Sequence, residues 1–166
     1  PLNITNPMKR LEFLAGRVLL QELLKNWDLE FTGLTKDDQG KPYFKNLPCH
    51  LSLSHSYPYV AAIIDRKKCV GIDLEQPKDK LLRIAPRVLS FEELENAGSD
   101  IVKHCVYWCA KEALIKVYGK RHLTLAEHLL ISPFSIGNEG NLTGRIIANN
   151  SVVSVQLYYR VYDNFV

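Results

Sequence analysis

The sequence contains, at residues 101–119, the stretch IVKHCVYWCAKEALIKVYG. Its length and apolar character predict a long helix from about Ile101 to Tyr118 that ends at Gly119, because glycine readily adopts the left-handed conformation that closes a helix. Shortly before it, Ser90 and Glu93 have the spacing of a capping box, a pattern typical of a helix N-terminus. We therefore expect the second half of the chain to be built around this long helix.

Segments with strand character follow the long helix and also fill much of the first half. After the helix, residues 129–136, 142–148 and 152–162 are predicted strands, the last being rich in β-branched and aromatic residues. In the first half, Asn6 and Pro7 predict the start of a helix that ends near Lys25. Leucine and serine alternate over 51–54 as in a half-buried strand, and the apolar runs 59–64 and 69–74 should pair as a hairpin.

The order of helix and then strands occurs twice along the chain. It predicts an α+β fold of two similar lobes, one at residues 1–75 and one at 76–166. Because the chain begins at Pro1 and not at methionine, we expect the first lobe to lack an N-terminal segment.

The composition excludes several classes of protein. With 166 residues, of which 46% are hydrophobic and 23% charged, the chain can bury an ordinary globular core. The net charge of +3 does not require nucleic acid, but it suits an acidic partner or a phosphate-rich ligand. No apolar run approaches the roughly 18 residues of a membrane span, and the pattern of a signal peptide does not open the chain, so we expect a cytoplasmic protein with reduced cysteines.

Two groups of charged residues point to phosphate chemistry. In the stretch GIDLE at 71–75, Asp73 and Glu75 are two residues apart, which places both carboxylates on one face of an extended segment. On the long helix, Glu112 and Lys116 share one stripe with Trp108. If this stripe faces the extended segment, three carboxylates converge on Mg²⁺, or on Mn²⁺. The simpler interpretation, a solvated turn and a helical surface pair, stays open on these residues alone.

Four motifs in fixed order decide between these interpretations. They are GKP at 40–42, SLSH at 52–55, GIDLE at 71–75 and WCAKEALIK at 108–116. Together they resemble the signature of the Sfp-type 4′-phosphopantetheinyl transferases, and the resemblance extends from about residue 9 to 162. Two departures are Cys109, where Ser or Thr is commoner, and Gly119-Lys120-Arg121 in place of Gly-Lys-Gly.

The resemblance implies a fold, a reaction and a set of site residues. The fold would be a pseudo-dimer of two α+β lobes, with coenzyme A in the cleft between them. The metal ligands would be Asp73, Glu75 and Glu112. Coenzyme A would contact Arg10, Arg17, Lys41, Pro42, Ser54, His55, Asp73, Lys111 and Lys116, with both of the last two near its pyrophosphate. Glu112 would take the proton of the attacking serine, directly or through a metal-bound water, and Lys116 would neutralise the leaving phosphate.

The implied activity is that of an Mg²⁺-dependent enzyme of the holo-acyl-carrier-protein synthase type. Coenzyme A would be its substrate, and its partner would be an apo acyl or peptidyl carrier protein, whose serine receives the phosphopantetheine group. We expect a monomer that binds neither nucleic acid nor membrane. Two alternatives are a catalytically silent relative that binds coenzyme A or carrier protein, and a metal-dependent phosphohydrolase.

Overall fold

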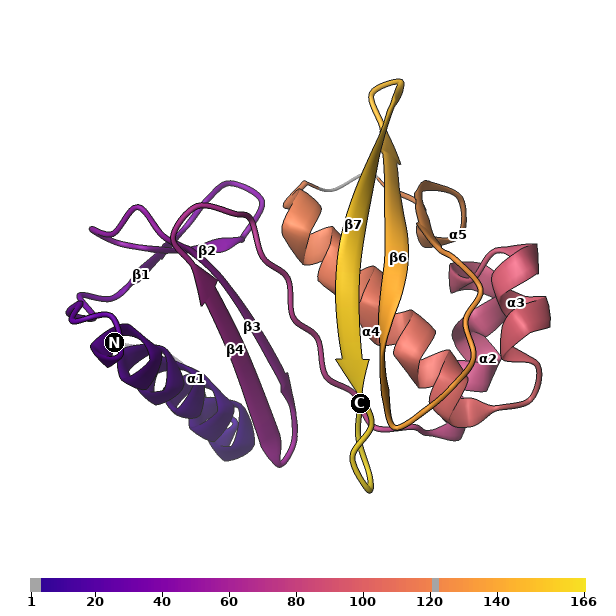
Figure 1. The fold of residues 1–166 in the computed structure, drawn as a ribbon. Coiled ribbons are helices and arrows are strands. Elements are labelled where there is room, and N and C mark those ends of the chain that lie inside the picture. Colours follow the sequence, from indigo (N-terminus) through magenta and orange to yellow (C-terminus); the bar gives the residue numbers. More distant parts are fainter. Residues whose placement is uncertain (1–3, 121–122) are drawn as a thin grey trace. The chain divides into compact units, whose positions relative to one another are not determined.

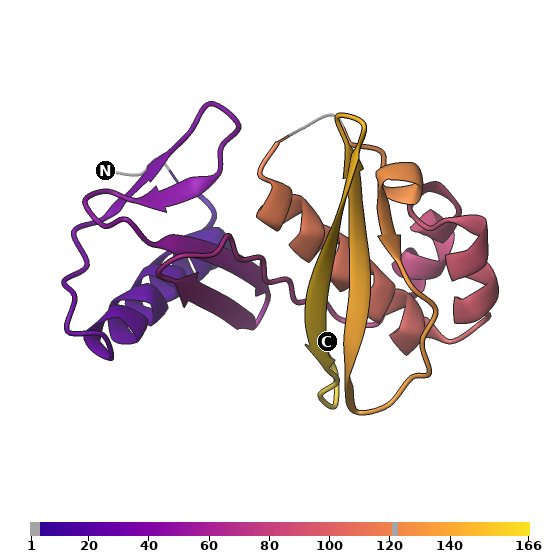
Figure 2. The same ribbon diagram turned by 45° about the horizontal axis from the view of Figure 1, so that its top comes forward.

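The computed structural model describes residues 4–120 and 123–166. The chain divides into two compact units, Pro1–Leu74 and Glu75–Val166, and each is described by itself below. Helices accompany antiparallel strands in both units (Figures 1 and 2), so the predicted α+β class is confirmed. In the part of the chain that the structure describes, no helix combines the length and the apolar character needed to cross a membrane.

The first unit opens with helix α1 (Pro7–Lys25), as predicted. Its start is set locally, because the Asn6 side chain accepts hydrogen bonds from the amides of Met8 and Lys9 while Pro7 occupies the first helical position. The helix packs along two strands of this unit, β3 (His50–Ser56) and β4 (Tyr59–Asp65) (Figure 1).

Two antiparallel hairpins complete the first unit. Their strands are β1 (Leu34–Lys36), β2 (Pro42–Phe44), β3 (His50–Ser56) and β4 (Tyr59–Asp65). Strand β1 pairs with β2, and β3 pairs with β4. The core of the unit is formed by buried apolar side chains of α1, β2 and β3, namely Leu20, Leu24, Phe44 and Leu51.

The predicted hairpin between residues 59–64 and 69–74 is wrong. Strand β4 pairs along its whole length with β3, because the two are joined by a tight turn after Ser56, and residues 69–74 form no strand. Instead, the amide of Ile72 donates to Ser52 Oγ at 3.1 Å and that of Leu74 donates to Ser54 Oγ at 3.3 Å. Both serines are buried, so the serine face of β3 is not the solvated face that the Leu-Ser alternation predicted.

The described residues of the second unit form four helices. They are α2 (Asp79–Val88), α3 (Phe91–Ala97), α4 (Ile101–Tyr118) and α5 (Leu125–His128). The long helix has the predicted bounds, with Asp100 capping its N-terminus and Gly119 ending it in the left-handed conformation at φ 73°. The predicted capping box is also confirmed, with Ser90 and Glu93 each accepting a backbone hydrogen bond from the other at the start of α3.

A three-stranded antiparallel sheet completes the second unit. Its strands are β5 (Leu129–Ile131), β6 (Glu139–Ala148) and β7 (Ser151–Arg160), in the order β5-β6-β7. All three predicted strands exist, although the first ends at Ile131 and the second already begins at Glu139. Helix α4 packs against the sheet, and a Cβ atom at Gly144 of β6 would lie only 2.9 Å from Leu114 of α4. Glycine at this position therefore allows helix and sheet to approach closely.

Candidate functional site

Two of the predicted site residues, Ser54 and Asp73, are in direct contact in the first unit. Ser54 Oγ donates a hydrogen bond to Asp73 Oδ1 at 2.6 Å, and the same oxygen accepts the amide of Leu74. Ser52 holds Ile72 in the same way. Ser52 and Ser54 of β3 therefore fix the segment that carries Asp73. Because a carboxylate offers several acceptor positions, the hydrogen bond from Ser54 is compatible with metal ligation.

Glu75 begins the second unit, and its carboxylate is held by neighbours in the chain. Oε1 accepts the amide of Gln76 at 2.9 Å, and Oε2 lies 2.7 Å from the ammonium of Lys80. The backbone of Glu75 exchanges two hydrogen bonds with Val166, at 3.0 and 2.9 Å. The position of this carboxylate is thus defined by local contacts, and a metal ion bound to Oε2 would compete with Lys80.

Helix α4 presents Trp108, Glu112 and Lys116 on one stripe. All three are partly exposed, whereas most of their helical neighbours between His104 and Leu114 are buried. Trp108 packs against the core of the unit. Glu112 and Lys116, four residues apart, are therefore charged side chains on one partly exposed stripe of α4.

The structure places Lys111 differently from its predicted role at the pyrophosphate. Its side chain is fully buried, and its ammonium lies 2.6 Å from the carboxylate of Glu93, which is also buried. Burial lowers the pKa of Lys111 from its ordinary value, while the hydrogen bond and the charge of Glu93 oppose that change. A lysine enclosed in this way has an internal partner, and its ammonium lies in the interior of the second unit.

The GKP motif lies at the hairpin between β1 and β2. The Asp37 carboxylate accepts the amides of Gln39 and Lys41, and Gly40 has φ 86°, which glycine tolerates best. Lys41 is partly exposed, and Pro42 begins β2. The positive φ explains why residue 40 is glycine, and the hydrogen bond to Asp37 holds the backbone of Lys41.

His55 and the two arginines of α1 also lie in the first unit. His55 Nδ1 is 3.2 Å from a carboxylate oxygen of Glu12 on α1, and its own side chain is 59% exposed. Arg10 is exposed, whereas Arg17 folds back along its helix, donates to the carbonyl of Phe13 and stacks on that ring. Desolvation lowers the pKa of Arg17 from its ordinary value.

The three predicted metal ligands are divided between the two units. Asp73 belongs to the first unit, and Glu75 and Glu112 belong to the second. Within the described residues, no group of three His, Cys, Asp or Glu side chains forms a ready metal site. By their chemistry, carboxylates are the hard oxygen donors that Mg²⁺ prefers, so this donor set fits the ion. The assignment of all three residues to one Mg²⁺ stays a prediction.

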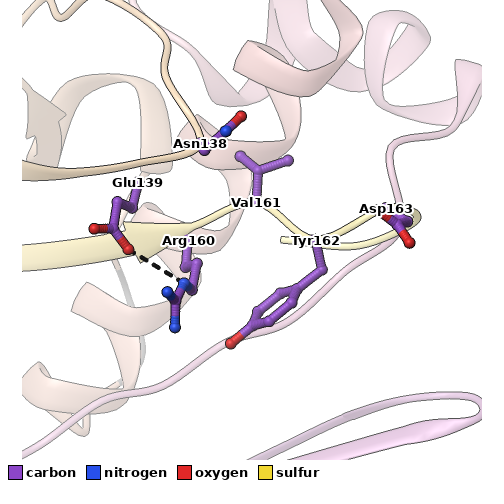
Figure 3. Close-up of a pocket in the computed structure, with 6 residues that line it drawn as sticks. All are labelled: Asn138, Glu139, Arg160, Val161, Tyr162 and Asp163. Atoms are coloured by element: carbon purple, nitrogen blue, oxygen red, sulfur yellow. Dashed lines mark ion pairs between the residues drawn. The ribbon is translucent and has the colours of Figure 1, made fainter.

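A hollow lies near the C-terminal end of β7 in the second unit. Figure 3 shows its lining, which consists of Asn138, Glu139, Arg160, Val161, Tyr162 and Asp163. The guanidinium of Arg160 pairs with Glu139 at 3.2 Å, and the Tyr158 hydroxyl donates to the same carboxylate. None of the predicted site residues lines this hollow.

Three partners of the predicted site residues were not identified from the sequence. Glu12 pairs with His55, Lys80 pairs with Glu75, and Glu93 pairs with Lys111. For Glu12 no sequence signal exists, because its partner is 43 positions away. Lys80 follows Glu75 by only five residues, so this ion pair could be predicted from the sequence. Glu93 was recognised only as a capping residue.

Comparison with known proteins assigns the family. The sequence model described as the 4′-phosphopantetheinyl transferase superfamily matches residues 69–157, just over half of the chain. The chain is also similar to 4′-phosphopantetheinyl transferase psf-1 of Bacillus pumilus, with 29% identity over 154 residues, covering 87% of this chain and 64% of the relative. A Haemophilus influenzae protein provisionally named a 4′-phosphopantetheinyl transferase is 31% identical over 94 residues, covering 51% of this chain and 39% of that protein.

The chain thus spans less than two thirds of the length of either relative. The matched region nevertheless includes the GIDLE segment and the whole of helix α4, with Asp73, Glu75, Glu112 and Lys116. From this match we conclude that the chain belongs to the 4′-phosphopantetheinyl transferase superfamily.

Proposed function

We propose that this chain transfers the 4′-phosphopantetheine group of coenzyme A to a serine of an apo acyl or peptidyl carrier protein, in a reaction that depends on Mg²⁺. The observation that carries the proposal is the family match over residues 69–157, which contains the three carboxylates and Lys116. Support comes from helix α4, which leaves Glu112 and Lys116 partly exposed.

The reaction requires a base and charge neutralisation. The serine oxygen forms a bond to the phosphorus that carries the pantetheine arm, and the bond from this phosphorus to the bridging oxygen breaks, so that adenosine 3′,5′-bisphosphate leaves. Glu112 accepts the hydroxyl proton of the serine. Lys116, one helical turn further on, lies near the pyrophosphate and offsets the negative charge that develops there.

Asp73, Glu75 and Glu112 would hold the metal ion. When bound, Mg²⁺ supplies positive charge that neutralises the pyrophosphate oxygens. The hydrogen bond from Ser54 orients Asp73 for this role, and the backbone pairing with Val166 holds Glu75. At the nucleotide end, His55, Lys41 and Arg10 are exposed or partly exposed groups that suit phosphate recognition.

Intact mass spectrometry tests this proposal. The protein is incubated with coenzyme A, Mg²⁺ and several apo carrier proteins, and we expect one of them to gain the mass of one phosphopantetheine group. The Asp73→Ala variant should give no adduct, whereas Glu95→Ala, which removes an exposed carboxylate of α3, should behave as the wild type. Absence of an adduct with every carrier protein would refute the proposal.

The pairing of Glu75 with Lys80 favours one alternative, a relative that binds coenzyme A without transferring its arm, because an ammonium already neutralises this predicted metal ligand. Calorimetry distinguishes the two functions. The silent relative would bind coenzyme A with an affinity that does not depend on Mg²⁺ and would form no adduct. The transferase would bind more tightly when Mg²⁺ is present.

A further inference from the structure

The second unit contains a buried ion pair to which the reaction gives no direct role. Lys111 Nζ of α4 lies 2.6 Å from Glu93 Oε2 of α3, and the two side chains are 0% and 1% exposed. Enclosing two charges costs a large desolvation penalty, which the attraction between them offsets only when their remaining hydrogen-bonding positions are also filled.

Backbone groups fill these positions. The ammonium of Lys111 has three donors, which reach Glu93 Oε2, the carbonyl of Leu125 at 2.9 Å and that of Leu129 at 2.6 Å. Glu93 Oε1 accepts the amide of Ile131 at 2.7 Å, and Oε2 accepts the amide of Ser90 at 2.7 Å. The pair therefore joins the N-terminus of α3, helix α4, helix α5 and strand β5.

The buried pair affects the orientation of Glu112 and Lys116, because Lys111 lies on the same helix. Lys111 immediately precedes Glu112, and successive side chains of a helix point about 100° apart. Holding Lys111 in the interior fixes the rotation of α4 about its axis, and with it the partly exposed stripe that carries Glu112 and Lys116. The contacts with Leu125 and Leu129 also fix the position of α4 along its axis relative to α5 and β5.

Stability alone is a weak explanation for such a pair. Buried ion pairs can often be replaced by well-packed hydrophobic side chains of similar volume without loss of stability. Orientation has a stricter requirement, because displacing a reacting group by about 1 Å can lower a rate about 100-fold. We propose that Glu93 and Lys111 are positioning residues, which orient Glu112 and Lys116 for the phosphopantetheinyl transfer inferred above. This assignment rests on the proposed function.

The test removes the pair without leaving a lone buried charge. In Glu93→Gln/Lys111→Met, both side chains become neutral at similar volume. We expect the variant to unfold cooperatively but at a lower temperature than the wild type, because the buried carbonyls of Leu125 and Leu129 lose their donor. The kcat for transfer should fall about 10- to 100-fold, and KM for coenzyme A should change less than about 2-fold. Calorimetry should likewise show nearly unchanged affinity for coenzyme A. The matched control is Glu95→Gln/Lys67→Met, which neutralises one exposed glutamate and one exposed lysine and should change nothing.

A cooperatively folded double variant with normal kcat would overturn the assignment. If the double variant lost cooperative unfolding, the single variant Lys111→Arg would test the positioning role instead. Arginine keeps the charge and the hydrogen-bond donors, but its larger head group displaces α4. In that case a folded Lys111→Arg enzyme with lowered kcat supports positioning, and one with normal kcat refutes it. Failure of the wild-type protein to modify any carrier protein would instead refute the proposed function itself.

Discussion

Replacing Ser54 with alanine distinguishes two roles for this residue. If Ser54 only contacts coenzyme A, its removal leaves the stability of the ligand-free protein unchanged. The structure predicts otherwise, because the Ser54 hydroxyl donates to Asp73 Oδ1 at 2.6 Å and accepts the amide of Leu74 at 3.3 Å within the first unit. Both hydrogen bonds disappear in Ser54→Ala.

The size of the effect follows from these two contacts. A hydrogen bond to a charged group contributes about 1.5–3 kcal/mol, and a buried amide left without an acceptor costs about 1–3 kcal/mol. We take values near the lower limits, because Asp73 is partly exposed to water and the bond from Leu74 is long. The free energy of unfolding should therefore fall by about 2 kcal/mol, which corresponds to a shift of about 1 M in the urea midpoint for a typical dependence on denaturant.

Urea unfolding of the ligand-free protein measures this shift. Trp27 packs against the core of the first unit and Trp108 against that of the second. In a Trp108→Phe background, the fluorescence of Trp27 therefore reports on the unit that contains Ser54. Thr32→Ala, which removes an exposed hydroxyl of the same unit, serves as the control and should leave the midpoint unchanged.

One result would refute this reasoning. If Ser54→Ala unfolded at the wild-type urea concentration while its affinity for coenzyme A fell, Ser54 would act as a ligand contact, and its hydrogen bond to Asp73 would contribute nothing measurable to stability.

Further variants test the metal site, the base and the nucleotide end. Asp73→Ala should abolish transfer and make the calorimetric affinity for coenzyme A insensitive to Mg²⁺; wild-type turnover would show that Asp73 is not a ligand. Glu112→Gln should lower single-turnover transfer by about 10²- to 10⁴-fold with a much smaller loss of coenzyme A affinity, as expected for a lost base, and near-normal turnover would exclude that role. His55→Ala should weaken binding of coenzyme A more than binding of dephospho-coenzyme A, and equal losses would remove the 3′-phosphate as its partner.

The elements whose limits are set by local interactions were predictable from the sequence. Helix α1 starts at Pro7 because Asn6 caps the neighbouring amides, and helix α4 ends at Tyr118 because Gly119 takes the left-handed conformation. Such signals act over a few residues, so they can be read without knowledge of the fold. Strand pairing is different, since the partner of a strand is chosen by contacts distant in sequence, and the predicted partner of β4 was wrong.

The same distinction applies to the candidate site. The sequence alone identified the motifs, the family and the spacing that leaves Glu112 and Lys116 on one stripe of α4. Only the tertiary structure revealed that Ser54 holds Asp73, and that Lys111 turns inward to Glu93. Lys111 and Glu112 are adjacent charged residues on a helix with apolar residues all around it, so periodicity cannot tell which of them faces the interior. That choice depends on Glu93 and on the carbonyls of α5 and β5, which only folding brings to the ammonium.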